Sequence, residues 1–203
     1  MQILRKCIEN KNVIEVGSNY GDITSQILEM KPKNLLATDI NESRLDFLKK
    51  RFNNNKEVVI KKLDIFQNEK EYFEKYDTII LKEIINAFEI HYYNSILQNS
   101  IKYLTEGGSL IIIDYLPAIH LRQLFVRLLL SPFKFQRHFK RYFYNKKFKK
   151  QLNQEKLGHL FDNNNFKINY FKNVDPLNMS DRYLHKILEK IIPMKYLFIA
   201  TKR

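Results

Sequence analysis

The sequence has little glycine, one cysteine and no tryptophan: only five of its 203 residues are glycine. The single thiol, Cys7, cannot form an internal disulfide, which excludes a disulfide-stabilised secreted fold and fits a reducing compartment. No window reaches the roughly 18 apolar residues that a membrane-spanning helix needs. The first residues, MQILRKCIENK, lack the apolar core of a signal peptide. A cytoplasmic protein is therefore expected.

Acidic residues are absent between Asp114 and Glu155, and this gap holds most of the excess positive charge. The formal net charge is +13, yet outside the gap 25 Lys/Arg stand against 22 Asp/Glu. An anionic partner would therefore meet the protein at this segment. Ten cations lie within it: Arg122, Arg127, Lys134, Arg137, Lys140, Arg141, Lys146, Lys147, Lys149 and Lys150.

Short apolar runs alternate with helical patterns along the chain. Runs typical of buried strands lie at residues 12–16, 35–38, 57–63, 77–82 and 109–114, with two more near 166–172 and 195–201. Helical patterns lie between the first five, at 21–30, in the residues after Asn41, at 67–75 and at 91–104. Asn41 can cap the helix that follows it, and Gly107-Gly108 is expected to form a turn before the run at 109–114. This alternation predicts an α/β fold with a parallel sheet covered on both faces. No linker interrupts it, so residues 1–203 are expected to form one domain.

Glycines and acids stand where strands end. Gly17 and Gly21 follow the first strand, and a glycine pair at such a turn lets a ligand approach the backbone while helix N–H groups face an anion. Asp39 ends the second strand, 22 residues after Gly17, close to the spacing of about 20 in nucleotide-binding βαβ units. Asp64 ends the third strand, and its carboxylate could accept a hydrogen bond from an adenine amino group.

Five segments resemble, in order, the motifs of class I S-adenosylmethionine (SAM)-dependent methyltransferases. They are VIEVGSNYGDIT, ATDINESRLDFLKK, KKLDIF, YDTIILKEIINAFE and YLTEGGSLIIID, spread over residues 13–114. The final YLFIATKR resembles the last strand of that family, which runs antiparallel to the others. The resemblance implies a Rossmann-like, mostly parallel seven-stranded sheet with an antiparallel last strand, helices on both faces, and SAM as the cofactor.

The resemblance also implies which residues contact SAM. Asn19 replaces the middle glycine of the first motif, and Asn tolerates left-handed backbone angles better than most residues. Ile40 and Ile65 could sandwich the adenine ring. An NAD(P)-binding Rossmann domain is the rival interpretation, but GSNYGD at 17–22 does not fit the G-x-G-x-x-G pattern. The implied cofactor residues are Glu15, Gly17, Ser18, Asn19, Gly21, Asp39, Ile40, Asp64, Ile65, Leu81 and Lys82.

The sequence identifies no catalytic residue and no metal site. None of the five histidines has metal-ligand spacing together with acids or thiols. His91 and His120 could each act as a general base, and a surface or structural role is the alternative. DNA-base methylation is disfavoured, because Cys7 precedes the first strand and LKEI at 81–84 lacks an Asn/Asp-Pro-Pro-aromatic signature.

Residues 115–165 are expected to form a helical, basic insert that caps the acceptor site. Two helices separated by Ser131-Pro132 and a third at 153–162 are predicted. The pattern fits a cap packed on the sheet, an amphipathic helix on an anionic membrane surface, or an RNA-binding surface. We favour a small, lipid-like or quinone-type acceptor, reached by peripheral contact with a membrane. An RNA methyltransferase and a SAM-binding protein without catalysis are the alternatives.

Overall fold

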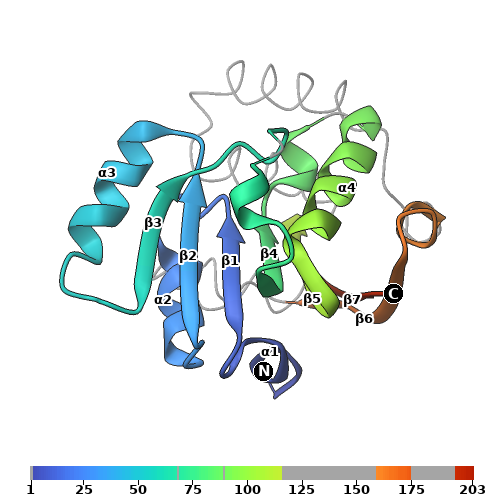
Figure 1. Cartoon of the computed structure of the whole chain (residues 1–203), viewed down its shortest axis with the longest axis horizontal. Coiled ribbons are helices and arrows are strands. Elements are labelled where there is room, and N and C mark those ends of the chain that lie inside the picture. Colours follow the sequence, from blue (N-terminus) through green and yellow to red (C-terminus); the bar gives the residue numbers. More distant parts are fainter. Residues whose placement is uncertain (1, 68, 89, 116–158, 175–194) are drawn as a thin grey trace, which may run out of the picture.

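The computed structural model describes residues 2–67, 69–88, 90–115, 159–174 and 195–203, which form a sheet flanked by helices (Figure 1). The helices are α1 (Gln2–Ile8), α2 (Asp22–Glu29), α3 (Glu42–Arg51) and α4 (Tyr93–Tyr103), with short 3₁₀ turns η1 (Lys70–Tyr72), η2 (Ile85–Ala87) and η3 (Ile90–Tyr92). The strands are β1 (Asn12–Val16), β2 (Asn34–Asp39), β3 (Val58–Lys62), β4 (Tyr76–Lys82), β5 (Leu104–Tyr115), β6 (Phe166–Val174) and β7 (Lys195–Lys202).

The seven strands form one sheet in the order β3-β2-β1-β4-β5-β7-β6. Strands β1 to β5 pair in parallel, whereas β7 pairs antiparallel with both β5 and β6. The predicted Rossmann-like sheet with an antiparallel last strand is thus confirmed. The carboxyl ends of β1 to β4 meet at the edge of the sheet opposite α1, as Figure 1 shows.

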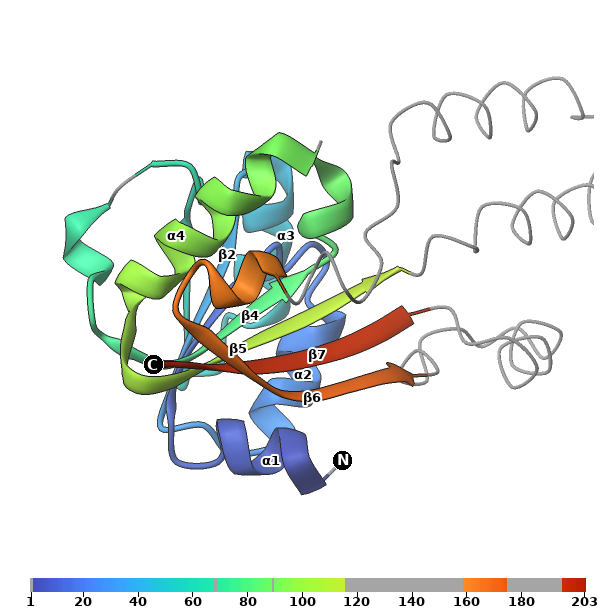
Figure 2. The same cartoon turned by 90° about the vertical axis from the view of Figure 1, so that its right-hand side faces the viewer.

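Strand residues alternate between two apolar layers, one on each face of the sheet. Ile14, Ile79 and Ile112 belong to the layer that packs against α4. Their neighbours Val13 and Ile80 belong to the layer that packs against α1 and α2. Figure 2 shows α4 on one side of the strands and α1 and α2 on the other. The expected cover of helices on both faces is therefore present.

Most helices begin and end near the predicted positions. Asn41 caps α3 as expected, because its side chain accepts hydrogen bonds from the backbone N–H groups of Ser43 and Arg44 at 2.9 and 3.4 Å. The charged helix predicted at 67–75 is only the single turn η1. Helix α1, which buries Leu4 and Ile8, was not predicted from the sequence.

Strand β5 differs from the prediction at its beginning. The sequence placed Gly107-Gly108 in a turn before a strand at 109–114, but the strand already begins at Leu104. The pairing of β4 with β5 shifts register between Tyr76 and Thr78, and Gly107 has a φ of +70°. The glycine pair therefore lies inside the strand, at this irregularity in the pairing, and not before the strand begins.

The expected basic insert lies mostly outside the described residues, which omit 116–158. Tyr115, its first residue, belongs to β5, and 159–165 are described at its other end. Residues 159–162 are helical, and Phe161 is fully buried. Its ring centroid lies 5.6 Å from that of Phe166 and 4.3 Å from that of Phe198. This end of the segment is therefore part of the core. In the portion of the chain that is described, no helix combines the length and apolarity needed to cross a membrane.

Candidate functional site

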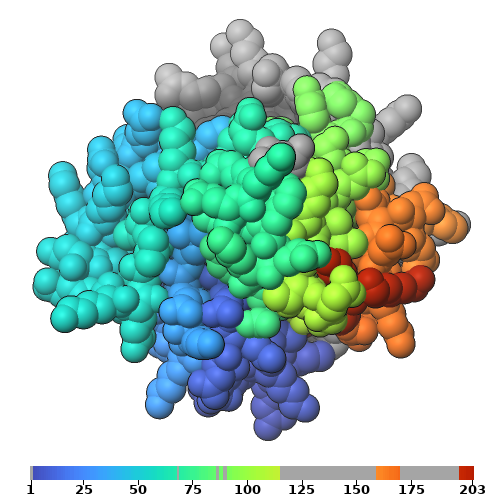
Figure 3. Space-filling model, in the orientation of Figure 1, coloured from blue at the N-terminus to red at the C-terminus, as the bar shows by residue number. Residues whose placement is uncertain are grey.

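A pocket of about 310 Å³ lies at the carboxyl ends of β1 to β4. This is the edge at which open α/β sheets bind their ligands. The chain between β3 and α4, teal to green in Figure 3, covers the middle of the face shown there. The pocket is lined by Val16, Gly17, Asn19, Asp39, Ile40, Arg44, Leu63, Asp64, Ile65, Lys82, Glu83, Ile84, Ala87 and Phe88.

The turn after β1 is held close to the ends of its neighbouring strands. The backbone N–H groups of Gly17 and Ser18 both donate to the carbonyl oxygen of Thr38 at 2.9 Å. Gly17 has a φ of +81°, and a Cβ atom there would lie 2.8 Å from Ile84 Cδ1 and 2.9 Å from the carbonyl oxygen of Lys82. Only glycine satisfies both the backbone angle and this close approach.

Asn19 adopts the left-handed conformation expected where it replaces a glycine, with a φ of +54°. Its backbone N–H donates to Asp39 Oδ2 at 3.0 Å. Its side-chain Oδ1 is buried and has no hydrogen-bond partner. Because Asn19 also lines the pocket, the residue presents polar groups at the wall of the pocket.

Gly21 has a packing role instead of a place in the pocket lining. It precedes α2 with a φ of +83°, and a Cβ atom there would lie 2.6 Å from Phe52 Cε2 and 2.9 Å from Leu48 Cδ2. The absence of a side chain thus allows the turn to pack against α3. Ser18 and Leu81, also implied as cofactor residues, are buried and do not line the pocket.

Glu15 is fully buried beneath the turn and does not line the pocket. Its Oε2 accepts hydrogen bonds from Ser18 Oγ at 2.9 Å and from Thr24 Oγ1 at 2.6 Å, whereas Oε1 has no partner. Burial raises the pKa of this carboxyl group, and the two hydroxyl groups and the positive charge of Lys82 oppose that rise. Glu15 thus joins the turn to the first residues of α2.

Asp39 is 3 % exposed, and its carboxylate is held in place by neighbouring donors. The backbone N–H of Asn41 donates to Oδ1 at 2.9 Å, and Arg44 Nη1 lies 3.6 Å from Oδ2. Each carboxylate oxygen can accept two hydrogen bonds. Asp39 therefore retains the capacity to accept further hydrogen bonds from a ligand in the pocket.

The turn after β3 contributes a carboxylate and an apolar side chain. Asp64 is half-buried, and its Oδ1 accepts from the backbone N–H of Phe66 at 3.0 Å. Ile65 is buried, whereas Ile40, which also lines the pocket, is 59 % exposed. Ile40 is therefore an apolar surface that a bound ligand could cover.

The segment after β4 forms a pocket wall that was not predicted from the sequence. Glu83 has a φ of +57°, and its backbone N–H donates to the carbonyl oxygen of Ile113 at 2.9 Å. The chain then turns through η2, which brings Ile84, Ala87 and Phe88 to the pocket. A non-glycine residue in this conformation is uncommon and is often found at functional sites.

Three aromatic rings cluster at this wall. The centroid of Phe66 lies 4.9 Å from that of Phe88 and 5.4 Å from that of Tyr92. Phe88 lines the pocket, while Tyr92 is 42 % exposed. We call Phe66, Phe88 and Tyr92 the aromatic rim. The aromatic residues near the end of the fourth strand were the available sequence signal for it.

The single cysteine and the two candidate histidines are not among the described residues that line the pocket. Cys7 lies on α1, where its carbonyl accepts a hydrogen bond from Thr78 near the amino end of β4, so it is remote from the pocket. His91 is exposed, and its ring centroid lies 4.1 Å from that of Tyr92. His120 lies outside the described residues. Within the described ranges, no three His, Cys, Asp or Glu side chains form a group that could hold a metal ion.

Comparisons with known proteins agree with this geometry. Residues 14–110 match a family model described as a methyltransferase domain. No curated protein matches the chain. A SAM-dependent methyltransferase from Mesorhizobium loti has a TM-score of 0.69 at 12 % identity, over 99 % of this chain and 96 % of that one. A putative SAM-dependent methyltransferase from Listeria monocytogenes has a TM-score of 0.64 at 17 % identity, over 100 % of this chain and 96 % of that one.

A third solved structure was determined with the demethylated product of the cofactor. The trans-methyltransferase CalH, in complex with S-adenosylhomocysteine (SAH), has a TM-score of 0.68 at 16 % identity. The match covers 99 % of this chain and 54 % of that one. At such identities these structures establish a common fold.

Proposed function

The chain is a class I SAM-dependent methyltransferase, and we propose that it methylates a small, apolar acceptor in the pocket at the carboxyl ends of β1 to β4. A methyltransferase domain model matches the chain, and the strand order is that of this fold. The observation that carries this proposal is the convergence of Gly17, Asn19, Asp39 and Asp64 on one pocket. SAM is the cofactor, and a small molecule is the expected class of acceptor.

The pocket residues fit the adenosine part of SAM. Asp39 would accept hydrogen bonds from the ribose hydroxyl groups, and Asp64 from the adenine amino group. Ile40 and Ile65 would lie against the faces of the adenine ring, and the exposure of Ile40 is consistent with a surface that a ligand covers. Gly17 keeps the backbone close to the ligand. Glu15, Ser18, Gly21 and Leu81 would support this arrangement from beneath the surface.

SAM supplies a methyl group activated on a positively charged sulfur. The protein must align an acceptor atom with that methyl group and exclude water, and a general base is needed only if the acceptor must lose a proton. The aromatic rim adjoins the pocket through Phe88, and we expect the acceptor to enter beside it. Its rings offer apolar faces, which supports a lipid-like or quinone-type acceptor over a strongly polar one.

The basic segment motivates a proposal on location. We infer that residues 115–165 contribute the acceptor cap and contact an anionic membrane surface, because ten Lys/Arg lie between residues 122 and 150 of this segment without an intervening acid. Each surface cation can contribute on the order of 1 kcal/mol at an anionic bilayer. RNA binding is the second candidate, favoured by the same charges interleaved with aromatic residues. Co-sedimentation with anionic and neutral vesicles at several salt concentrations, beside binding to structured RNA, separates the two candidates.

Binding and transfer experiments test the proposed function. Calorimetry should detect binding of SAM and SAH, and no binding of NAD. Cell extract incubated with the protein and methyl-labelled SAM should then be separated into lipid, small-molecule and RNA fractions. We expect label in the lipid or small-molecule fraction. Label in RNA alone would favour the second candidate, and cofactor binding without any transfer would favour a SAM-binding protein that lacks catalysis.

A further inference from the structure

Glu83 brings a carboxyl group to the pocket wall at a strained point of the backbone. It follows β4, is half-buried and lines the pocket. Its φ of +57° lies in the left-handed region, which a residue with a side chain adopts only when its surroundings hold it there. The 2.9 Å hydrogen bond from its backbone N–H to the carbonyl oxygen of Ile113 is one such restraint. The fold therefore maintains an unfavourable conformation at a residue that lines the pocket.

The other acids near the strand ends have different positions or tasks. Asp39 and Asp64 follow β2 and β3, accept hydrogen bonds from backbone N–H groups, and are the acceptors proposed for adenosine. Glu15 and Asp114 are fully buried and do not line the pocket. Among the described residues that line the pocket, Glu83 is therefore the acid for which the cofactor gives no role.

The rest of the pocket wall after β4 is apolar. Ile84, Ala87 and Phe88 are the other described residues of this segment that line the pocket, and Phe88 belongs to the aromatic rim. The faces of the aromatic rings suit an apolar ring of a ligand. The carboxylate beside them favours a hydrogen-bond donor. A ligand that satisfies both features carries a hydrogen-bond donor on an otherwise apolar ring.

We propose that Glu83 accepts the proton of a hydroxyl group on the acceptor, which is a phenol-type molecule methylated on oxygen. This inference rests on the proposed function, because it needs a methyl donor in the same pocket. As the hydroxyl oxygen bonds to the methyl carbon, its proton passes to a carboxylate oxygen of Glu83, and the bond from carbon to sulfur breaks with its electron pair left on sulfur. Glu83 then releases the proton to water, so the products are a methyl ether, SAH and one proton.

Two aromatic probes that differ at the oxygen test the inference without turnover. 2-Naphthol can donate a hydrogen bond, whereas its methyl ether, 2-methoxynaphthalene, cannot. The fluorescence of both probes can be read in the presence of the protein, because the chain contains no tryptophan. With SAH bound, the wild type should bind 2-naphthol more tightly than the ether. Glu83→Ala should lower the affinity for 2-naphthol about tenfold and leave the affinities for the ether and for SAH unchanged.

Glu42→Ala is the matched control for this binding experiment. Glu42 is an exposed acid at the start of α3, pairs with Lys62 at 2.7 Å and does not line the pocket. Its removal should leave the affinities for both probes as they are in the wild type.

Methyl transfer separates removal of the proton from hydrogen bonding alone. Glu83→Gln keeps a carbonyl acceptor but cannot take a proton. We expect this variant to keep its affinity for SAH and most of its affinity for 2-naphthol. Its transfer of labelled methyl groups to the acceptor fraction of cell extract should fall by about a hundredfold or more. Mass spectrometry of the labelled product should locate the methyl group on oxygen.

The outcomes distinguish this inference from the proposed function. If the wild type binds SAH but neither probe, or both probes equally, the assignment of Glu83 is wrong while the proposed function stands. A methyl group found on carbon or nitrogen would overturn the assignment as well, and so would a loss of SAH affinity in Glu83→Ala. If the wild type does not bind SAH, the proposed function itself fails. Thermal melts confirm folding, and Glu83→Gly, which suits the left-handed backbone, replaces Glu83→Ala if that variant does not fold.

Discussion

The backbone N–H of Asn19 donates a 3.0 Å hydrogen bond to Oδ2 of Asp39, and this contact joins the turn after β1 to the end of β2. The left-handed conformation of Asn19 accompanies this contact. Asn19 thus adopts a left-handed backbone geometry that glycine adopts most readily, and adds a side-chain amide at the pocket. The same carboxylate of Asp39 is therefore both a structural acceptor and a candidate ligand-binding group.

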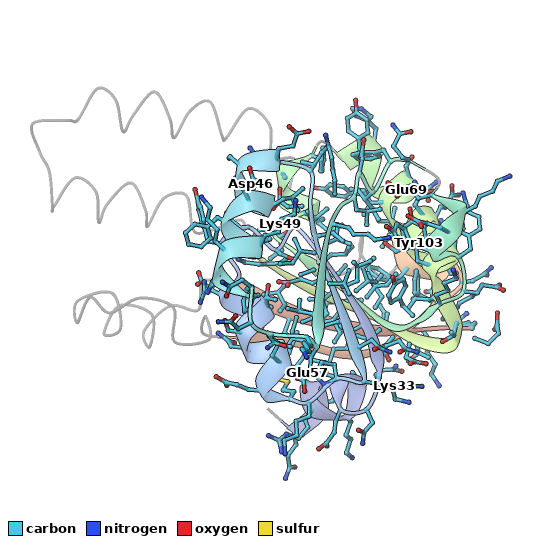
Figure 4. The ribbon with its side chains drawn as sticks, turned by 60° about the vertical axis from the view of Figure 1, so that its left-hand side comes forward. Lys33, Asp46, Lys49, Glu57, Glu69 and Tyr103 are labelled. Atoms are coloured by element: carbon cyan, nitrogen blue, oxygen red, sulfur yellow. The ribbon has the colours of Figure 1, made fainter. Side chains whose placement is uncertain are left out.

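Replacing Asp39 should weaken cofactor binding. Asp39→Ala removes the acceptor proposed for the ribose hydroxyl groups and frees the N–H groups of Asn19 and Asn41. We expect SAH affinity to fall by about 1–3 kcal/mol, the usual cost of leaving buried polar groups unpaired. Asp46→Ala is the control, because Asp46 lies on α3, exposed, with Lys49 3.9 Å away (Figure 4). Equal SAH affinity of Asp39→Ala and wild type, measured by calorimetry, would show that the ribose lies elsewhere.

Gly17 and Gly107 both have positive φ angles but differ in their surroundings, so alanine variants can distinguish the cost of the backbone angle from the cost of a steric clash. In Gly17→Ala a methyl group would lie 2.8 Å from Ile84 Cδ1, whereas in Gly107→Ala nothing lies within 4 Å of it. The left-handed angle alone costs about 1–2 kcal/mol. Urea denaturation should show this loss for Gly107→Ala and a larger loss for Gly17→Ala, which should also bind SAH less tightly. Equal stabilities of the two variants would mean that Ile84 moves aside freely.

The buried carboxyl group of Glu15 should make stability depend on pH. Its pKa in the folded protein is raised above the ordinary 4.5, chiefly by burial. The folded state therefore keeps a proton that the unfolded state has already lost, and the free energy of unfolding falls as the pH rises from the unfolded pKa to the folded pKa. Glu15→Gln removes this titration and can still accept from Ser18 and Thr24.

Urea denaturation of the two proteins from pH 4 to pH 8 measures this effect. The stability of the wild type relative to Glu15→Gln is expected to decline with rising pH and to level off above the folded pKa. Parallel curves over the whole range would contradict a raised pKa at Glu15. If the stability of the wild type relative to Glu15→Gln instead increased with rising pH, the folded state would stabilise the ionised form of Glu15.

The aromatic rim should affect transfer more than cofactor binding. Tyr92→Ala removes an exposed ring that contacts Phe66 and Phe88. We expect lower transfer of labelled methyl groups to the acceptor fraction, with SAH affinity kept. Phe47→Ala is the control: Phe47 is similarly exposed, at 46 % against 42 %, and stacks edge-on with Tyr20. Unchanged transfer in Tyr92→Ala would remove the aromatic rim from the acceptor site.

The sequence predicted the parts of the fold that depend on short-range patterns. Apolar runs ending in Gly17, Asp39 and Asp64 marked three strands, and the parallel register of these strands brings Gly17, Asp39 and Asp64 to one pocket. Gly21 was the instructive exception. Its position in a motif suggested a ligand contact, whereas its missing side chain makes room for Phe52. Spacing along a turn does not reveal which neighbour approaches it.

The wall after β4 was missed because no local pattern specifies it. Residues 83–88 are an irregular segment, with Glu83 in a left-handed conformation and a single 3₁₀ turn at η2. Its path depends on contacts distant in sequence, such as the hydrogen bond from Glu83 to the carbonyl of Ile113. The start of β5 was misplaced for a similar reason, since the strand extends back to Leu104 through its pairing with Tyr76, which is distant in sequence.

The position of β7 has a consequence for how the molecule folds. β7 follows β6 in the chain but lies between β5 and β6 in the sheet. Strand β6 therefore reaches the rest of the sheet only through β7, and the pairing of β7 with β5 joins residues that are far apart in sequence, as Ile111 and Ile199 are. Non-local pairings of this kind form late and slow folding. Strands β1 to β5 could assemble first and leave β5 as a transient exposed edge, which is the step at which self-association would compete with folding.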